Sequence, residues 1–162
     1  GVTITGGEPT IHRDLPFFVS NIKSMGYDVK LDTNGTNPDM VEYLISHDLL
    51  DYIAMDIKAP LNSIRYSRAA GIRIDADLLD KILRTKDIIM SSGIEHEFRT
   101  TVVPKIVGLD ELVEIRDATW GSAHFIQQFV PDYANHPEFR KLAPYSYDEL
   151  TDVARQINML IR

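Results

Sequence analysis

The chain has 162 residues, of which 44% are hydrophobic and 25% are charged. A chain of this length buries about two-thirds of its unfolded surface, so we expect residues 1–162 to form a single globular domain rather than a disordered or fibrous chain. Lys and Arg number 17 against 24 Asp and Glu, which gives a formal net charge of -7. Because phosphate binding needs clustered cations and the sequence has no basic tract, nucleic acid is excluded as an expected partner.

No apolar run approaches the roughly 20 residues that cross a bilayer, and no charged-then-apolar leader precedes the first predicted strand. We therefore expect a cytoplasmic protein with no membrane partner. The sequence has no cysteine, which excludes disulfides, thiolate nucleophiles and Cys-based metal sites within these residues. Because the first residues already have the pattern of a strand and the first residue is Gly1, not Met, we interpret the chain as a fragment of a longer polypeptide.

Apolar, β-branched stretches alternate with segments of helical periodicity along the chain. This order is typical of a parallel sheet wrapped by helices, so the predicted fold class is α/β with about five β-then-α units. The predicted strands are Val2 to Thr5, Tyr27 to Asp32, Tyr52 to Ile57, Glu95 to Val103 and His124 to Phe129.

Each predicted strand is followed by a predicted helix. The helices are expected from near Asp14 to Gly26, from Asn37-Pro38 through Ile45, from Asp75 to Gly93, from about Leu109 to Thr119 and from Ser146 toward Ile161. Asn37 is a favoured capping residue, and Pro38 is favoured at the first helical position. Ser146 and Glu149 have the spacing of a capping box. Trp120, like the Phe and Tyr residues at helical spacing, is interpreted as a core residue.

Two connections are much longer than the usual 2 to 6 residues between a strand and a helix, namely Lys58 to Asp75 and Phe129 to Ser146. Both follow the carboxyl end of a predicted strand. Ligands bind at that end of parallel sheets and barrels. We therefore expect these two connections to face a substrate.

Acidic residues recur where the first three strands end. Glu8, Asp32 and Asp56 follow one another at intervals of 24 residues, as expected if each marks the same point in successive units. Each acid alone is explained equally well as a helix cap or an ion-pair partner. Together they favour a binding site at one rim, because several charges on one face are costly unless they are paired or bound to a ligand.

The Gly6-Gly7-Glu8-Pro9 turn is the clearest local motif. Two glycines at a strand end let backbone groups approach a ligand closely, Pro9 fixes the direction of the exit, and Glu8 could accept a hydrogen bond from an ammonium. No phosphate-binding glycine loop of the usual kind is present.

The segments GVTITGGEPT, VKLDTNGT, DYIAMDIKAP, HEFRTTVVP and FIQQFVP occur in this order along the chain. Their order and spacing resemble those of radical S-adenosylmethionine (SAM) enzymes. The likeness is greatest to the activating enzymes of glycyl-radical proteins, such as those that activate anaerobic ribonucleotide reductase and pyruvate formate-lyase. The resemblance implies a partial parallel (β/α) barrel whose first unit is missing here.

The resemblance also implies roles for particular residues. Gly6, Gly7, Glu8 and Pro9 match the motif that holds the methionyl ammonium of SAM. Asp32 and Thr33 match a strand-end pair near the SAM carboxylate. A stretch that faces the cofactor and the incoming substrate is matched by Met55, Asp56 and Lys58. Of these, Asp56 and Lys58 are the expected catalytic residues. Arg99 matches a basic partner of the SAM carboxylate or ribose. Gln128 matches a residue on the adenosine side.

The implied chemistry is reductive cleavage of SAM by a [4Fe-4S] cluster, and the radical formed abstracts hydrogen from a glycine of a partner enzyme. Anaerobic ribonucleotide reductase is the expected partner, and reduced flavodoxin or ferredoxin the expected electron donor. The family holds its cluster with three cysteines ahead of the GGEP motif, and this chain has none. We therefore expect the chain alone to be inactive in SAM cleavage.

Two other readings of the same residues stay open. Glu8, Asp32 and Asp56 could bind a divalent cation for lyase or hydrolase chemistry. Alternatively, the chain could be a binding module without catalytic activity.

Overall fold

The computed structural model describes residues 1–134 and 136–161, and its strands occur close to where the sequence predicts them. They are β1 (Val2–Ile4), β2 (Val29–Thr33), β3 (Tyr52–Asp56), β4 (Glu95–Val102), β5 (Ala123–Gln128) and β6 (Leu160–Ile161). They form one open sheet in the order β1-β2-β3-β4-β5-β6. β1 pairs with β2, β2 with β3, and β5 with β6, all in parallel. The predicted α/β class with an unclosed parallel sheet is therefore confirmed.

The chain forms two compact units. The first consists of Gly1–Asp56 and Asp77–Glu97, and the second of Ile57–Ala76 and Phe98–Arg162. β1 to β3 belong to the first unit, β5 and β6 to the second, and β4 contributes residues to both.

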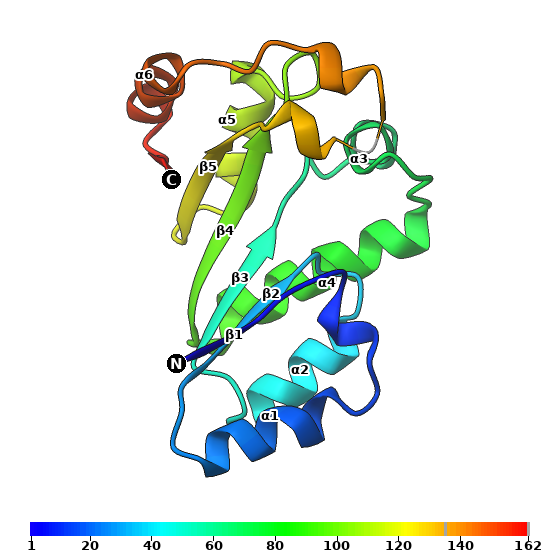
Figure 1. Cartoon of the computed structure of the whole chain (residues 1–162), viewed down its shortest axis with the longest axis vertical. Coiled ribbons are helices and arrows are strands. Elements are labelled where there is room, and N and C mark those ends of the chain that lie inside the picture. Colours follow the sequence, from blue (N-terminus) through cyan, green and yellow to red (C-terminus); the bar gives the residue numbers. More distant parts are fainter. Residues whose placement is uncertain (135, 162) are drawn as a thin grey trace. The chain divides into compact units, whose positions relative to one another are not determined.

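The first unit packs helices against the β1–β3 strands. Its helices are α1 (Leu15–Ser24), α2 (Pro38–Ser46), α4 (Ala76–Ser92) and the short 3-10 helix η1 (Pro9–Ile11). In Figure 1, α1 and α2 lie side by side below these strands. Alternate residues of β2 are buried because successive side chains of a strand point to opposite faces of the sheet, and only one of these faces is fully covered. Side chains of both layers form this core, namely Val19, Val29, Leu31, Leu44 and Ile53.

The second unit contains α3 (Ser63–Ala70), α5 (Leu109–Ala118), α6 (Tyr147–Ile157) and the 3-10 helices η2 (Pro131–Tyr133) and η3 (Phe139–Lys141). Its buried side chains include Phe98, Leu112, Ile115, Ile126 and Leu150. Ser146 accepts a hydrogen bond from the Glu149 backbone N–H at 3.2 Å, and the Glu149 carboxylate accepts one from the Ser146 backbone N–H at 2.7 Å. The predicted capping box is therefore confirmed. Among the residues that the structure describes, no helix is both long and apolar enough to span a bilayer.

Three local predictions were wrong. The last helix ends at Ile157 rather than near Ile161, because Asn158 takes the left-handed conformation at φ 55° and its N–H closes the helix on the Ala154 carbonyl. The chain then continues as β6, which pairs with β5. α2 begins after Asn37 with Pro38 at its first position, as predicted, but the Asn37 side chain makes no capping hydrogen bond, since its Nδ2 donates instead to the Thr10 carbonyl at 2.5 Å. The connection after β3 also contains α3, which the sequence analysis leaves without a helix.

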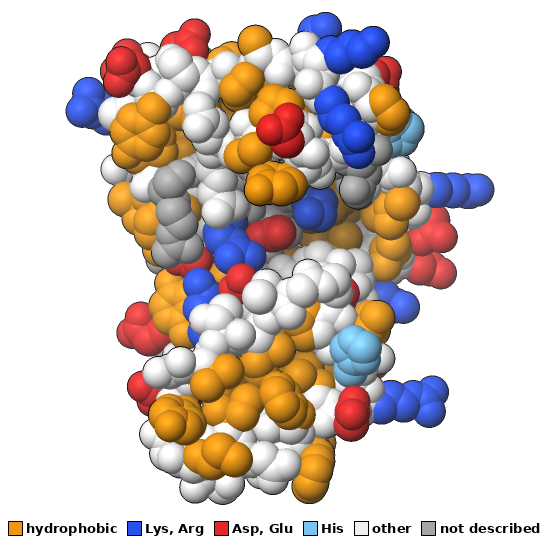
Figure 2. All heavy atoms as spheres, in the orientation of Figure 1, with side chains coloured by type: hydrophobic (Ala, Val, Ile, Leu, Met, Phe, Trp, Pro, Cys, Tyr) orange, Lys and Arg blue, Asp and Glu red, His pale blue; other side chains and the backbone are white. Residues whose placement is uncertain are grey.

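The expected core includes aromatic residues that the structure exposes. Trp120 is 66% exposed, Phe17 is 72% exposed and Phe18 is 54% exposed. The buried stripe of α1 consists of Leu15, Val19 and Ile22, whose spacing of four and three residues follows one face of a helix. Phe17 lies on the opposite face of the same helix, and Phe18 lies at the solvent edge of the buried stripe. Figure 2 shows hydrophobic side chains on the lower part of the visible face, where α1 and α2 lie.

Candidate functional site

The turn after β1 is organised by the carboxylate of Glu8. Its Oε1 accepts hydrogen bonds from the Thr10 backbone N–H at 3.2 Å, the Thr10 hydroxyl at 2.6 Å and the Thr33 hydroxyl at 2.8 Å. Its Oε2 accepts from the Asn34 backbone N–H at 2.6 Å. We call Glu8, Thr10, Thr33 and Asn34 the Glu8 cluster. Because carboxylate acceptors give the stronger hydrogen bonds, the cluster fixes the end of β1 to the end of β2.

The parallel register explains why these two strand ends meet. Ile4 pairs with Leu31, so the chain leaves both strands at the same edge of the sheet. Thr33 continues the network, since its Oγ1 accepts from the Gly35 backbone N–H at 3.1 Å. The sequence predicts that the acids Glu8, Asp32 and Asp56 converge at the strand ends. The structure joins Glu8 to Thr33 of the second strand end, whereas Asp32 contacts Lys30 instead.

Open space lies beside the glycines of the same turn. Gly6 has φ at 131°, a conformation that favours glycine, and a Cβ built on Gly6 or on Gly7 would meet no atom within 4 Å. Glu8 Oε1 already accepts three hydrogen bonds and Oε2 accepts one, so the remaining acceptor capacity of the carboxylate is on Oε2. The turn therefore offers an accessible backbone next to a fixed negative charge.

Asp32 lies on the other face of β2 from Thr33. Its Oδ1 is 3.7 Å from the Nζ of Lys30, and the same Nζ is 3.2 Å from Oε1 of Glu97. Glu97 is almost completely buried, at 1% exposure, and its Oε2 accepts a hydrogen bond from the Tyr52 hydroxyl at 3.1 Å. Asp32 therefore belongs to a charged group on this face of the sheet.

Lys30 and Glu97 are residues that the sequence analysis missed. The available signal was an acid in the middle of a predicted strand, Glu95 to Val103. A buried carboxylate is rare unless it is paired, so an acid at this position predicts a cation partner on a neighbouring strand.

Met55 supports the loop after β2. Its side chain is fully buried, and a Cβ added at Gly35 would overlap its Cε. Thr85 of α4 donates from its hydroxyl to the Gly35 carbonyl at 2.7 Å. Asp56, at the end of β3, is half-buried. The structure thus gives Met55 a packing contact directly under the loop that carries Asn34 and Gly35.

Three predicted site residues, Lys58, Arg99 and Gln128, belong to the second unit. The Lys58 backbone N–H donates to the Tyr66 hydroxyl at 3.3 Å. The Arg99 carbonyl accepts from the Ile57 backbone N–H at 2.8 Å. Gln128 Nε2 donates to the Tyr145 carbonyl at 2.8 Å, which ties the end of β5 to the segment before α6.

His124 is a buried histidine of the second unit, at 4% exposure. Its Nε2 is 2.9 Å from the Thr100 hydroxyl and its Nδ1 is 2.8 Å from the Thr119 hydroxyl. Each hydroxyl also has a backbone carbonyl as acceptor, Ile57 at 2.7 Å from Thr100 and Ile115 at 3.1 Å from Thr119, so both ring nitrogens are hydrogen-bonded by buried hydroxyls. Burial lowers the pKa of His124 to about 4, so this histidine is a neutral structural residue at physiological pH.

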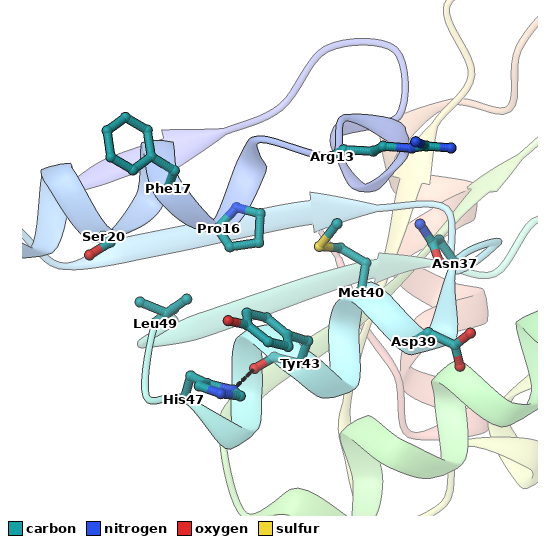
Figure 3. Close-up of a pocket in the computed structure, with 10 residues that line it drawn as sticks. All are labelled: Arg13, Pro16, Phe17, Ser20, Asn37, Asp39, Met40, Tyr43, His47 and Leu49. Atoms are coloured by element: carbon teal, nitrogen blue, oxygen red, sulfur yellow. Dashed lines mark hydrogen bonds between the residues drawn. The ribbon is translucent and has the colours of Figure 1, made fainter.

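A cavity of about 880 Å³ lies between α1 and α2. Figure 3 shows Pro16, Met40 and Tyr43 along it, with Arg13 toward one end and His47 toward the other. None of the predicted site residues lines this cavity. Within the described residues, no three His, Asp or Glu side chains are grouped as a metal site, so the divalent-cation alternative gains no support.

Comparisons with known proteins identify the family. The model of the radical SAM superfamily matches residues 1–118. The chain is 34% identical over 157 residues to a protein of Methanocaldococcus jannaschii named as a glycyl-radical enzyme activating enzyme, MJ1227, covering 95% of this chain and 65% of that protein. It is 31% identical over 116 residues to a second such protein of the same organism, MJ1632, covering 70% of this chain and 43% of that protein. The chain thus spans less than two-thirds of the length of either relative.

Solved structures share the fold. A domain of pyruvate-formate lyase-activating enzyme from Bacteroides vulgatus has a TM-score of 0.68 and 12% identity, covering 100% of this chain and 97% of that one. Streptococcus suis SuiB bound to S-adenosylmethionine has a TM-score of 0.69 and 15% identity, covering 99% of this chain and 38% of that one. At these identities the likeness shows the fold alone, and the family rests on the sequence match. The chain belongs to the radical SAM superfamily.

Proposed function

We propose that this chain forms the SAM-binding part of an enzyme that activates a glycyl-radical protein. The observation that carries the proposal is the Glu8 cluster, in which one carboxylate ties a glycine turn with open space beside it to the end of the next strand. Membership of the radical SAM superfamily and the similarity to proteins named as activating enzymes support the same assignment.

The residues of the first turn fit the amino-acid end of SAM. The open space at Gly6 and Gly7 admits a ligand to the backbone, and Glu8 Oε2 has capacity to accept from an ammonium. Gly6, Gly7, Glu8 and Pro9 would hold this end, with Thr33 toward its carboxylate on the Glu8 side of β2. Asp32, on the other face of β2, would act on that carboxylate through a monovalent cation, because two carboxylates repel each other. Since the Thr33 hydroxyl donates to Glu8, part of its role is to fix the carboxylate that binds.

The remaining predicted residues complete the proposal. Arg99 would pair with the SAM carboxylate or ribose and Gln128 would bind the adenosine side, while Asp56 and Lys58 would serve the reacting side. Met55 would act from beneath, through the Gly35 loop against which it packs. When bound, SAM would supply a 5′-deoxyadenosyl radical, because its one-electron reductive cleavage gives this radical and methionine. The radical would abstract hydrogen from a glycine of the partner. The protein's own task is to bind, orient and exclude water.

The residues of this chain do not fit a [4Fe-4S] cluster. Such clusters are held by thiolates, and the chain has no cysteine. We propose that the ligands of the cluster come from protein outside these residues. The whole enzyme is then a cytoplasmic oxidoreductase, with anaerobic ribonucleotide reductase as its partner and reduced flavodoxin or ferredoxin as its electron donor.

Calorimetric titration of the chain with SAM tests the proposal. We expect saturable binding of SAM, weaker binding of methionine, and no deoxyadenosine formation by the chain under reducing, anaerobic conditions. Adenosine serves as the control ligand, because it lacks the ammonium that Glu8 is proposed to accept from. Absence of saturable SAM binding, or equal affinity for SAM and adenosine, would overturn the assignment of the Glu8 cluster.

A further inference from the structure

A second cavity, of about 320 Å³, lies in the second unit. Basic side chains reach it from three segments: Arg68 from α3, Lys105 from the connection after β4, and His136 from the connection after β5. Each segment follows the carboxyl end of a strand, which is the end where parallel sheets bind ligands. Two of the segments are the long connections that the sequence analysis expects to face a substrate.

The cations at this cavity have no anionic partner within the described part of the chain. Neither Arg68 nor Lys105 forms an ion pair there, whereas Arg65, Arg84 and Arg116 each pair with carboxylates at 2.6 to 2.7 Å. In a chain with a net charge of -7, carboxylates are in excess. Two unpaired cations at one cavity are therefore available to an anion from outside the chain. Figure 2 shows Lys and Arg side chains with a His beside them at the upper right of the visible face, where α3 and η3 lie.

Lys105 is held in an unusual backbone conformation. Its φ is 70°, in the left-handed region that is unfavourable for an L-residue other than glycine. Hydrogen bonds from the backbone N–H groups of Ile106 and Val107 to the Val103 carbonyl, at 3.1 and 2.9 Å, fix the turn. Glycine would fit this position with less strain, and residues held in strained backbone conformations cluster at ligand-binding sites.

The other lining groups indicate the kind of anion. His136 contacts Phe139 edge to face, with ring centroids 6.3 Å apart, and forms an aromatic wall. Glu138 also lines the cavity, and no ion pair within the described residues joins it to either cation. A carboxylate beside two cations accepts hydrogen bonds from ligand hydroxyls. The volume is about ten times the roughly 30 Å³ that one water occupies in the liquid, so there is room for an organic body beside the anionic group.

We propose that this cavity binds the phosphate group of a hydroxyl-bearing organic phosphate, with a sugar phosphate as the simplest case. A phosphate dianion balances Arg68 and Lys105, whose guanidinium and ammonium donate to its oxygens. The His136 imidazole adds a donor, and Glu138 accepts from a sugar hydroxyl. The proposal does not rest on the SAM assignment, because none of these residues belongs to the Glu8 cluster.

The test is calorimetric titration of the full 162-residue chain with ribose 5-phosphate, inorganic phosphate and ribose at constant ionic strength. We expect ribose 5-phosphate to bind more tightly than inorganic phosphate, and ribose to show no saturable binding. Arg68→Gln and Lys105→Gly are each expected to weaken ribose 5-phosphate binding by about tenfold. Lys105→Gly removes the ammonium while glycine adopts the left-handed turn without strain, so this variant is expected to stay folded.

Lys141→Gln is the matched control, because Lys141 is an exposed lysine of η3 that does not line the cavity. We expect it to change the affinity less than about twofold. Equal weakening by Lys141→Gln, equal affinity for ribose 5-phosphate and inorganic phosphate, or no saturable binding of ribose 5-phosphate would overturn the proposal. Binding of an acidic peptide without binding of ribose 5-phosphate would overturn it in favour of a protein partner. SAM affinity, measured on the same samples, reports separately on the proposed function.

Discussion

Glu8→Gln tests whether one carboxylate holds the ends of β1 and β2 together. The glutamine carbonyl can take the place of Oε1 and keep the three hydrogen bonds from Thr10 and Thr33, but its amide nitrogen then faces the Asn34 backbone N–H, donor against donor. In the opposite orientation, the amide nitrogen replaces Oε1, and the three hydrogen bonds that Oε1 accepts from Thr10 and Thr33 are lost instead. The smaller loss is one hydrogen bond to a charged group, so we expect the free energy of unfolding to fall by about 1.5–3 kcal/mol.

Urea unfolding followed by circular dichroism measures this difference. Glu42→Gln is the matched control in the same unit, since Glu42 is an exposed glutamate that pairs with Arg84 at 2.7 Å. A surface pair of this kind contributes about 0–1 kcal/mol. If Glu8→Gln costs no more than Glu42→Gln, the Glu8 cluster does not hold the two strand ends, and the reasoning is refuted.

Three further predictions concern other parts of the chain. Burial lowers the pKa of His124 from 6.5 to about 4, so between pH 4 and 6.5 the unfolded chain binds a proton that the native ring does not. The free energy of unfolding should therefore increase by about 3 kcal/mol as the pH rises through this window, and pH-dependent urea unfolding of His124→Gln should lack this increase. Gly35→Ala should lower the thermal midpoint more than Gly93→Ala, since both glycines have φ at 77° but only at Gly35 would a Cβ meet other atoms; equal shifts would contradict this. Asp32→Ala should weaken SAM binding by about tenfold in calorimetry, and unchanged affinity would remove Asp32 from the proposed site.

The strands were predictable because each carries a strong local pattern. Val29 to Thr33 alternates between buried and half-buried residues, and the apolar residues of this segment are β-branched or aliphatic. The capping box at Ser146 was equally predictable, since its two hydrogen bonds join residues three apart. Element ends were less predictable. Asn158 ends α6 through a left-handed backbone conformation, which no periodicity reveals.

The contacts of the candidate site divide in the same way. The meeting of Glu8 and Thr33 follows from parallel strands that end at one edge. The spacing of the acids pointed instead to Asp32, which lies on the other face of β2 because successive side chains of a strand alternate between faces. The pairing of Lys30 with Glu97 joins residues that are 67 positions apart in the sequence, and no local pattern connects them. Exposure of Phe17 was missed because hydrophobicity alone does not say which face of α1 meets the sheet.

The central claim is that the glycine turn after β1 is a ligand-binding surface, and SAM affinity of Gly7→Val tests it most directly. A Cβ at Gly7 meets no protein atom within 4 Å, so the added side chain begins in the open space proposed for the ligand. The account predicts a free energy of unfolding within about 0.5 kcal/mol of the parent chain and SAM binding weakened by at least about tenfold. Parent-like SAM affinity in a folded Gly7→Val chain would contradict it.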